Sequence, residues 1–189
     1  ARDASNIVFA PHWYDGFTVF MKKFNPFVAY DVRDGKLVIV PGRIRKSFAE
    51  QLAYLKHGAP QQPGGVPTLI GEFGIPFDME QKRAYRTGDF RAQIQAMDRT
   101  FQALEANLLS GTLWNYTADN SNAHGDQWNG EDFSIFSRDQ QGEPGDPDSG
   151  GRALEGVVRP YPRAIAGDGC RRRAVGVAGP RCTPDYRES

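Results

Sequence analysis

Three short apolar runs alternate along the sequence with two segments of helical periodicity, and this order constrains the fold more than any other feature. The runs lie at residues 7–10, 66–70 and 111–114. Strands that alternate with helices form right-handed βαβ crossovers, which place the strands side by side in a parallel sheet. We therefore expect an α/β fold with three parallel strands and helices packed on them.

The helical segments are identified by the spacing of their apolar residues. In residues 47–56 an apolar face is followed by the stop signal Gly58. The stronger helix is expected to begin at Asp89, as its N-cap, and to stop at Gly111. Its apolar stripe covers about five turns and consists of Phe90, Ile94, Met97, Phe101, Leu104 and Leu108. Such a stripe predicts packing against a sheet.

Shorter elements fill the sequence between these segments. Residues 27–30 and 37–40, joined through Asp34 and Gly35, are predicted to form a hairpin within a long loop after the first run. After the polar loop the chain is expected to return to order at residues 133–136, and a last short helix is predicted at 152–158.

Composition excludes several functional classes. The chain has 189 residues, 23 basic and 23 acidic, so no bulk charge favours nucleic acid or an anionic membrane. No apolar stretch approaches the roughly 20 residues of a transmembrane segment. We recognise no signal peptide, which leaves the localisation open between secreted and cytoplasmic. The length is also short of the about 250 residues of a complete eight-stranded α/β barrel.

The composition changes near the C-terminal end. From Gly167 onward Gly, Pro and Arg dominate without periodicity, and three consecutive arginines follow Cys170. We therefore predict one domain at residues 1–166 and an irregular tail at 167–189. Cys170 and Cys182 are the only cysteines, and two cysteines do not determine a redox compartment.

Glu72 is the leading candidate for catalysis. It follows the second apolar run, between Gly71 and the pair Phe73-Gly74. The carboxyl ends of the strands form the face of an α/β barrel that carries its active site, and the flanking glycines permit close approach of a ligand. A carboxylate that caps a helix or pairs with an arginine would have the same position, and the sequence alone leaves both readings open.

The first run ends in a second candidate group. His12 and Tyr14 lie two residues apart and therefore project to the same side of an extended chain. A hydroxyl or imidazole beside a nucleophilic carboxylate can orient it and keep it ionised. The alternative is a histidine satisfied by the backbone next to two core aromatic residues, Trp13 and Tyr14.

The third run ends in Trp114, whose flat face suits a sugar ring, although core packing is the alternative. A polar and aromatic loop follows, and from it we select as substrate-binding residues Asn115, Asp119, Trp128 and Glu131. Loops of this composition also form simple turns. The loop lacks the ligand spacing of an EF-hand, and the histidines and cysteines lack the spacing of a zinc site, so we predict neither a metal nor a cofactor.

Together these segments resemble the C-terminal half of a glycoside hydrolase family 5 barrel, most closely its endoglycoceramidase-like members. The matching motifs are His12-Trp13-Tyr14, Glu72-Phe73-Gly74 and Trp114, followed by the loop at residues 125–134. The resemblance covers residues 5–166. It implies a partial (β/α)8 barrel of TIM type that carries the sixth, seventh and eighth strands, with Glu72 as the nucleophile and Trp114 stacked on the sugar.

The resemblance further implies a retaining β-glycosidase that acts on glycosphingolipid-type β-glucosides. The alternatives are a β-glucosidase or endoglucanase of the same family, or a catalytically incomplete carbohydrate-binding fragment. In the family the acid/base glutamate follows an asparagine on the fourth strand, and none of the eight glutamates of this chain has an Asn-Glu-Pro context. We therefore expect the chain to self-associate or to need a complementary N-terminal half barrel, because open sheet edges promote association.

Overall fold

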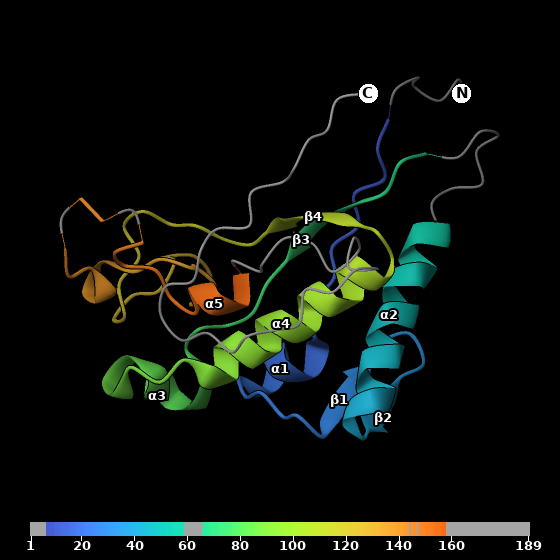
Figure 1. The fold of residues 1–189 in the computed structure, drawn as a ribbon, viewed down its shortest axis with the longest axis horizontal. Helices are drawn as coiled ribbons and strands as arrows, with labels where there is room; N and C mark the ends of the chain where they lie inside the picture. The colour runs from blue at the N-terminus through green and yellow to red at the C-terminus, as the bar shows by residue number, and fades with distance from the viewer. Residues whose placement is uncertain (1–6, 59–65, 144, 147, 158–189) are drawn as a thin grey trace, which may run out of the picture. The chain divides into compact units, whose positions relative to one another are not determined.

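The computed structural model describes residues 7–58, 66–143, 145–146 and 148–157. The predicted boundary between residues 166 and 167, the tail and both cysteines lie outside these residues. Figure 1 shows the arrangement of the elements. Their order is α1 (Gly16–Met21), β1 (Val28–Asp31), β2 (Lys36–Ile39), α2 (Pro41–His57), β3 (Leu69–Phe73), α3 (Met79–Thr87), α4 (Arg91–Ala106), β4 (Ser110–Leu113), a 3-10 turn (Arg138–Gln140) and α5 (Leu154–Val157).

Two of the three predicted parallel segments form a ladder, whose register shifts between Ile70 and Phe73. β3 pairs with β4 in parallel, with Leu69 opposite Ser110. The first run forms only two parallel bridges to the same segment, Phe9 to Thr68 and His12 to Glu72, so a regular strand at residues 7–10 was a wrong prediction. Pro11 lies between the two bridges and has no N–H for the ladder, which explains the interruption.

The boundaries of β3 and β4 also differ from those predicted. β3 begins at Leu69, three residues later than expected, and includes Glu72. Pro67 cannot donate to a ladder, so regular pairing starts only beyond it. β4 ends at Leu113, which leaves Trp114 as the first residue after the strand.

The helices of the core are confirmed in type and corrected in extent. α2 begins at Pro41, six residues before the predicted start, because proline suits the first turn of a helix. α4 ends at Ala106, where the side chain of Asn107 donates to the Ala103 carbonyl. Leu108 therefore leaves the predicted stripe and is 79% exposed. Gly111 lies within β4 and is not the helix stop.

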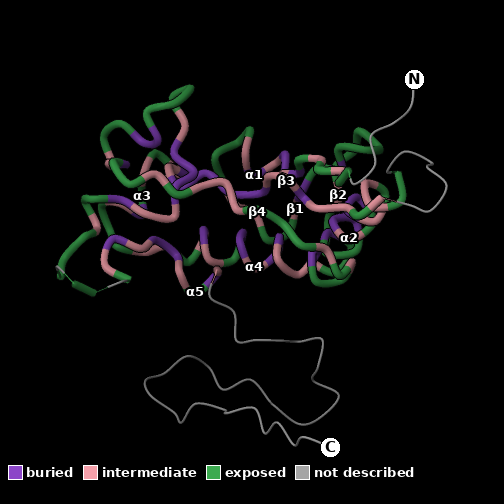
Figure 2. The backbone as a smooth tube through the Cα atoms, turned by 90° about the horizontal axis from the view of Figure 1, so that it is seen from above, coloured by how far each residue is buried: buried purple, intermediate pink, exposed green. Residues whose placement is uncertain are grey.

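The N-terminus of α4 corrects the predicted cap. The N-cap residue is Phe90, and Asp89 lies one position earlier, where its carboxylate accepts the backbone N–H of Arg91 at 3.1 Å. The core lies between the helices and the parallel pair, and Figure 2 shows buried positions along the side of α4 that faces the strands. Its fully buried side chains include Phe48, Leu52, Ile70 and Met97.

The predicted hairpin is confirmed with a shift of one residue. β1 and β2 pair antiparallel, with Ala29 opposite Val38. Asp31 supports the turn, since its carboxylate accepts the backbone N–H groups of Arg33 and Asp34 at 3.1 and 3.2 Å. Gly35 has a φ of +65°, a conformation that favours glycine.

Two helices were not predicted. The N-cap of α1 is Asp15, whose carboxylate accepts the N–H and the hydroxyl of Thr18 at 3.3 and 2.6 Å. α3 follows Asp78. Residues 133–136 form no strand, only one bridge from Phe136 to Gly151. The short helix predicted at 152–158 appears as α5.

Candidate active site

Glu72 is the fourth residue of β3 and its side chain is 27% exposed. The glycine that follows two positions later permits a close approach of the neighbouring strand end. A Cβ atom on Gly74 would lie 2.1 Å from the carbonyl oxygen of Trp114. Only glycine therefore lets the chain after β3 pass this close to the residue that follows β4.

Two side chains of the first segment converge on one oxygen of Glu72. The hydroxyl of Tyr14 donates to Oε2 at 3.0 Å, and Nδ1 of His12 lies 3.0 Å from the same oxygen. The parallel bridge between His12 and Glu72 aligns the two segments, and the backbone N–H of Trp13 donates to the Glu72 carbonyl at 3.0 Å. The predicted alternation of side chains is thus present, with His12 and Tyr14 both at the carboxylate.

Trp13 lies on the opposite side of this segment and belongs to the core. It is 4% exposed, its indole N–H donates to Gln51 at 3.1 Å, and its ring meets Phe48 edge to face at 5.0 Å. These contacts of Trp13 with two residues of α2 fix the backbone that carries His12 and Tyr14 relative to that helix.

Tyr14 remains a hydrogen-bond donor over a wide pH range. Burial raises the pKa of its hydroxyl above the ordinary value, and the hydrogen bond to Glu72 and the negative charges of Glu72 and Glu131 raise the pKa further. The phenol therefore keeps its proton and can donate to the carboxylate whenever that group is ionised.

A cavity of about 420 Å³ opens beside this carboxylate. It brings together five of the residues selected from the sequence, and the full lining is Tyr14, Val19, Glu72, Trp114, Trp128, Glu131 and Phe133. The first and third parallel segments, β3, α1 and the loop after β4 all contribute to it. Val19 and Phe133 were not identified from the sequence, since an isolated apolar residue carries no functional signal there.

Three selected residues lie outside the cavity lining. His12 contacts Glu72 but is half-exposed at its edge. The amide of Asn115 donates to Asp126 at 3.1 Å, and Asp119 is an exposed residue that accepts from the Gln127 amide at 2.8 Å. The structure therefore gives Asn115 and Asp119 partners within the loop.

Buried carboxylates organise the loop that carries Trp128 and Glu131. Asp126 accepts the backbone N–H groups of Phe133 and Ser134 at 2.7 and 3.2 Å. Asp132 accepts from the Asn120 amide at 2.9 Å, and the same amide donates to Asp126 at 2.9 Å. These carboxylates are therefore engaged by N–H donors. In the described parts of the chain, no group of three or more His, Cys, Asp or Glu side chains is arranged to hold a metal ion.

Arg152 anchors the same loop from the segment just before α5, and the sequence contained no signal for this contact. Its side chain is fully buried and donates to the two Asp132 oxygens at 3.2 and 2.5 Å. The guanidinium also lies 4.6 Å from the centre of the Phe77 ring. Tyr85 donates its hydroxyl to Asp132 at 2.5 Å, and burial raises the pKa of this tyrosine far above the ordinary value.

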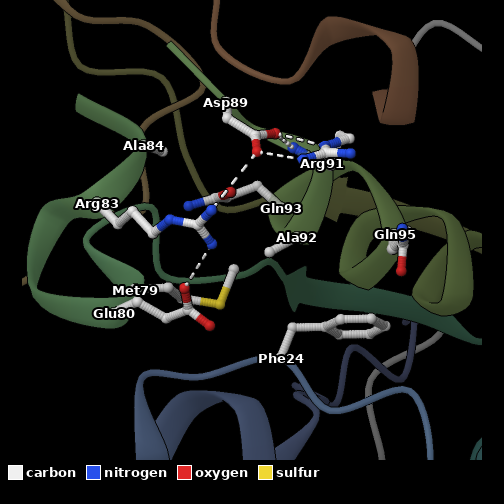
Figure 3. Close-up of a pocket in the computed structure, with 10 residues that line it drawn as sticks. All are labelled: Phe24, Met79, Glu80, Arg83, Ala84, Asp89, Arg91, Ala92, Gln93 and Gln95. Atoms are coloured by element: carbon white, nitrogen blue, oxygen red, sulfur yellow. Dashed lines mark hydrogen bonds and ion pairs between the residues drawn. The ribbon is translucent and has the colours of Figure 1, made fainter. Parts of the chain in front are cut away.

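A second cavity, of about 200 Å³, lies between α3 and the start of α4 (Figure 3). Its charged side chains neutralise one another. Arg83 lies 3.2 Å from Glu80 and 3.9 Å from Asp89, and Arg91 lies 2.7 Å from Asp89. The cavity beside Glu72 is the stronger candidate, because it combines a carboxylate, its hydrogen-bond donor and two tryptophans.

The chain is similar to part of several known glycosidases. A glucosylceramidase of Rhizopus delemar is 38% identical over 183 residues, which cover 86% of this chain and 27% of that protein. An ergosteryl-β-glucosidase of Saccharomyces cerevisiae is 40% identical over 143 residues, covering 70% of this chain and 19% of that protein. No protein-family model matches the chain.

A solved structure agrees with these relatives. The sterylglucosidase 1 of Cryptococcus neoformans superimposes with a TM-score of 0.73 at 37% identity, over 82% of this chain and 25% of that protein. The chain thus spans about a quarter of the length of these relatives. The likeness supports a glycosidase fold of the α/β class, with small parallel and antiparallel sheets.

Proposed function

We propose that the chain forms part of a retaining β-glucosidase in which Glu72 is the nucleophile. The observation that carries the proposal is the convergence of Tyr14 and His12 on one oxygen of Glu72, at the carboxyl end of parallel strands and beside a cavity. A nucleophilic carboxylate must be ionised and oriented toward the anomeric carbon. The Tyr14 hydroxyl performs both tasks, because it donates to the carboxylate and keeps its own proton.

The cavity lining supports a sugar as the ligand. Trp114 and Trp128 offer aromatic faces, and Glu131 offers a second carboxylate that can accept hydrogen bonds from sugar hydroxyls. We assign these three residues to substrate binding. Asn115 and Asp119 keep a supporting role through the loop that carries Trp128.

The substrate class follows from the relatives together with the lining. The names of two relatives pair a glucoside with an apolar aglycone, ceramide in one and ergosterol, as a β-glucoside, in the other. Val19 and Phe133 add apolar surface to the cavity. We infer that the substrates are lipid β-glucosides of the glycosphingolipid type, bound by a barrel of the family 5 kind.

A retaining mechanism needs a second carboxyl group about 5 Å from the nucleophile, which acts first as acid and then as base. In the resembled family this group lies on a strand that has no counterpart here. We therefore propose that a complementary half barrel supplies it, either from further sequence or from an associated chain. If the monomeric chain is active alone, Glu131 is the first residue to test in this role.

Trapping of the glycosyl-enzyme tests the assignment directly. Incubation with an activated 2-deoxy-2-fluoroglucoside should add one sugar, and peptide mass spectrometry should locate it on Glu72. Glu72→Gln should abolish the label and lower kcat by several orders of magnitude. Glu131→Gln, a matched change in the same cavity, should weaken binding but keep the label.

A carbohydrate-binding fragment without turnover is the alternative. The observation that favours this reading is that none of the eight glutamates has the Asn-Glu-Pro context of the acid/base. In that case sugar would quench tryptophan fluorescence, but the 2-deoxy-2-fluoroglucoside would label no residue even when a complementary half barrel is present. A label on any carboxylate other than Glu72 would remove Glu72 from the mechanism.

A further inference from the structure

The β1–β2 hairpin presents an apolar face whose β2 side chains are largely exposed among the described residues. Residues opposite each other in an antiparallel pair share a face, and the register places Val28 opposite Ile39 and Tyr30 opposite Leu37. Leu37 and Ile39 are 63% and 57% exposed. The other face carries Ala29, which is fully buried, and packs on α2.

The same apolar surface continues beyond the hairpin. Phe27, directly before β1, is 63% exposed. α1 packs along β1, since a Cβ atom on Gly16 would lie 3.2 Å from the Val32 side chain. Its last two residues, Phe20 and Met21, are also largely exposed. We call the exposed side chains of Phe20, Met21, Phe27, Tyr30, Leu37 and Ile39 the hairpin surface.

Basic residues surround this surface in the sequence. Residues 16–46 contain seven of the 23 basic residues and only two of the 23 acidic ones, a net charge of +5 in a chain whose total is zero. All seven basic residues are exposed, whereas Asp31 is buried. Four of the seven are ion-paired: Arg33 and Lys36 with Asp34, Lys22 with Asp78 and Lys46 with Glu50.

We propose that the hairpin surface docks onto an anionic lipid bilayer. Exposed apolar and aromatic side chains flanked by lysine and arginine are the combination that binds the interface of such a bilayer. A second copy of the chain is disfavoured at this surface, because the excess of basic residues in one copy would face the same excess in the other and repel it. An exposed sheet face of this kind is otherwise an aggregation hazard, so a covering partner is expected.

The position of α1 relates this surface to the candidate active site. Val19 lines the cavity beside Glu72, and the next two residues belong to the hairpin surface. The residues that would enter the bilayer, Phe20 and Met21, therefore follow a cavity-lining residue directly in the same helix. The choice of a bilayer rather than an acidic protein rests on the proposed function, since a lipid glucoside resides in a membrane.

Vesicle binding tests the proposal without any requirement for turnover. The purified chain is sedimented with vesicles of phosphatidylcholine and phosphatidylserine, and separately with vesicles of phosphatidylcholine alone. Leu37→Asp combined with Ile39→Asp should reduce the partition coefficient about tenfold or more, because two apolar contacts are replaced by charges that the anionic surface repels. Leu108→Asp changes a leucine that is even more exposed but lies outside the hairpin surface, and this variant should bind like the wild type.

Ionic strength supplies an independent readout. Raising the salt from about 0.1 M to about 1 M shortens the screening length from roughly 10 Å to roughly 3 Å and should release much of the bound protein. The double variant should keep its fold, because both positions are exposed, and circular dichroism checks this.

Several outcomes would overturn the docking proposal. They are the absence of binding to anionic vesicles, unchanged binding of the folded double variant, or a wild-type dimer that the double variant splits. A second assay separates the docking proposal from the proposed function: hydrolysis of a soluble chromogenic β-glucoside by the chain together with the complementary half barrel. A variant that loses vesicle binding but keeps hydrolysis affects only the hairpin surface. A variant that loses hydrolysis but keeps vesicle binding affects only the role of Glu72.

Discussion

Replacement of Arg152 by methionine should destabilise the chain more than any change of an exposed arginine. Arg152 is fully buried and makes its bidentate contact with Asp132, which is itself 2% exposed. Methionine keeps much of the apolar volume of the side chain but removes the charge. Arg152→Met therefore leaves a buried carboxylate whose remaining side-chain donors are the Asn120 amide and the Tyr85 hydroxyl.

The expected loss can be estimated from these contacts. Breaking a buried ion pair by removing one partner costs about 3–5 kcal/mol. The two remaining donors to Asp132 favour the lower end of this range, whereas the lost contact of the guanidinium with the Phe77 ring adds to the cost. For a domain of this size, such a loss lowers Tm by roughly 6–20 °C.

Urea unfolding followed by tryptophan fluorescence measures the effect. The midpoint should fall with little change in the m-value, since the surface exposed on unfolding is similar. Arg91→Met is the matched control, because Arg91 also forms a bidentate pair with Asp89 but its side chain is 80% exposed. Screening by water leaves such a pair with little effect on stability.

A double-mutant cycle isolates the pair itself. Asp132→Asn in the Arg152→Met background removes the uncompensated charge and should recover part of the lost stability. The reasoning is refuted if Arg152→Met shifts the midpoint no more than Arg91→Met does. Additive effects of Arg152→Met and Asp132→Asn would likewise show that the two side chains do not act as a pair.

Three further predictions concern the site and its pH dependence. Tyr14→Phe should lower kcat about tenfold to a hundredfold through loss of a hydrogen bond to a charged group, and unchanged turnover per folded molecule would assign Tyr14 to the core. Trp114→Ala should weaken β-glucoside binding and reduce the fluorescence quenched by sugar, so unchanged quenching would exclude stacking on Trp114. Because Tyr14 and Tyr85 have raised pKa values, unfolded chains lose these protons first as the pH rises above about 10. Stability should then fall by at most about 1.4 kcal/mol per pH unit for each phenol, and Tyr85→Phe should flatten that decline in alkaline urea titrations.

The sequence was informative where a local pattern reports on local structure. The hairpin followed from two apolar stretches around Asp34-Gly35, and α4 followed from its apolar stripe. The contact of Tyr14 with Glu72 was predictable for the same reason, since alternation along an extended segment sets the side on which Tyr14 lies.

Contacts between residues that lie far apart in the sequence could not be predicted, because no local pattern indicates them. Arg152 lies 20 residues after its partner Asp132, and nothing near either residue distinguishes it from a surface charge. Asp119 shows the same limit, because its place in a polar loop did not reveal that its carboxylate accepts from the Gln127 amide. The helix α1 was missed because its six residues are too few to show a period.

Two buried ion pairs explain how the walls of the cavity are held. Arg99 of α4 donates to Asp15 at 2.5 Å, and Asp15 caps α1, whose Val19 lines the cavity. Arg152 holds Asp132 in the same manner, next to Glu131 on the other wall. One wall is the short helix α1 and the other belongs to the loop after β4, and neither has a sheet ladder to fix it.

The net contribution of such pairs to stability is small, because desolvation offsets most of the attraction between the charges. Their effect is on specificity, since any other position of α1 or of the loop after β4 would leave a charge buried without its partner. We infer that the two arginines restrict these two segments to one arrangement around Glu72. On this argument, loss of either arginine should disturb sugar binding under conditions in which the chain is still folded, because Val19 and Glu131 are then free to leave the cavity wall.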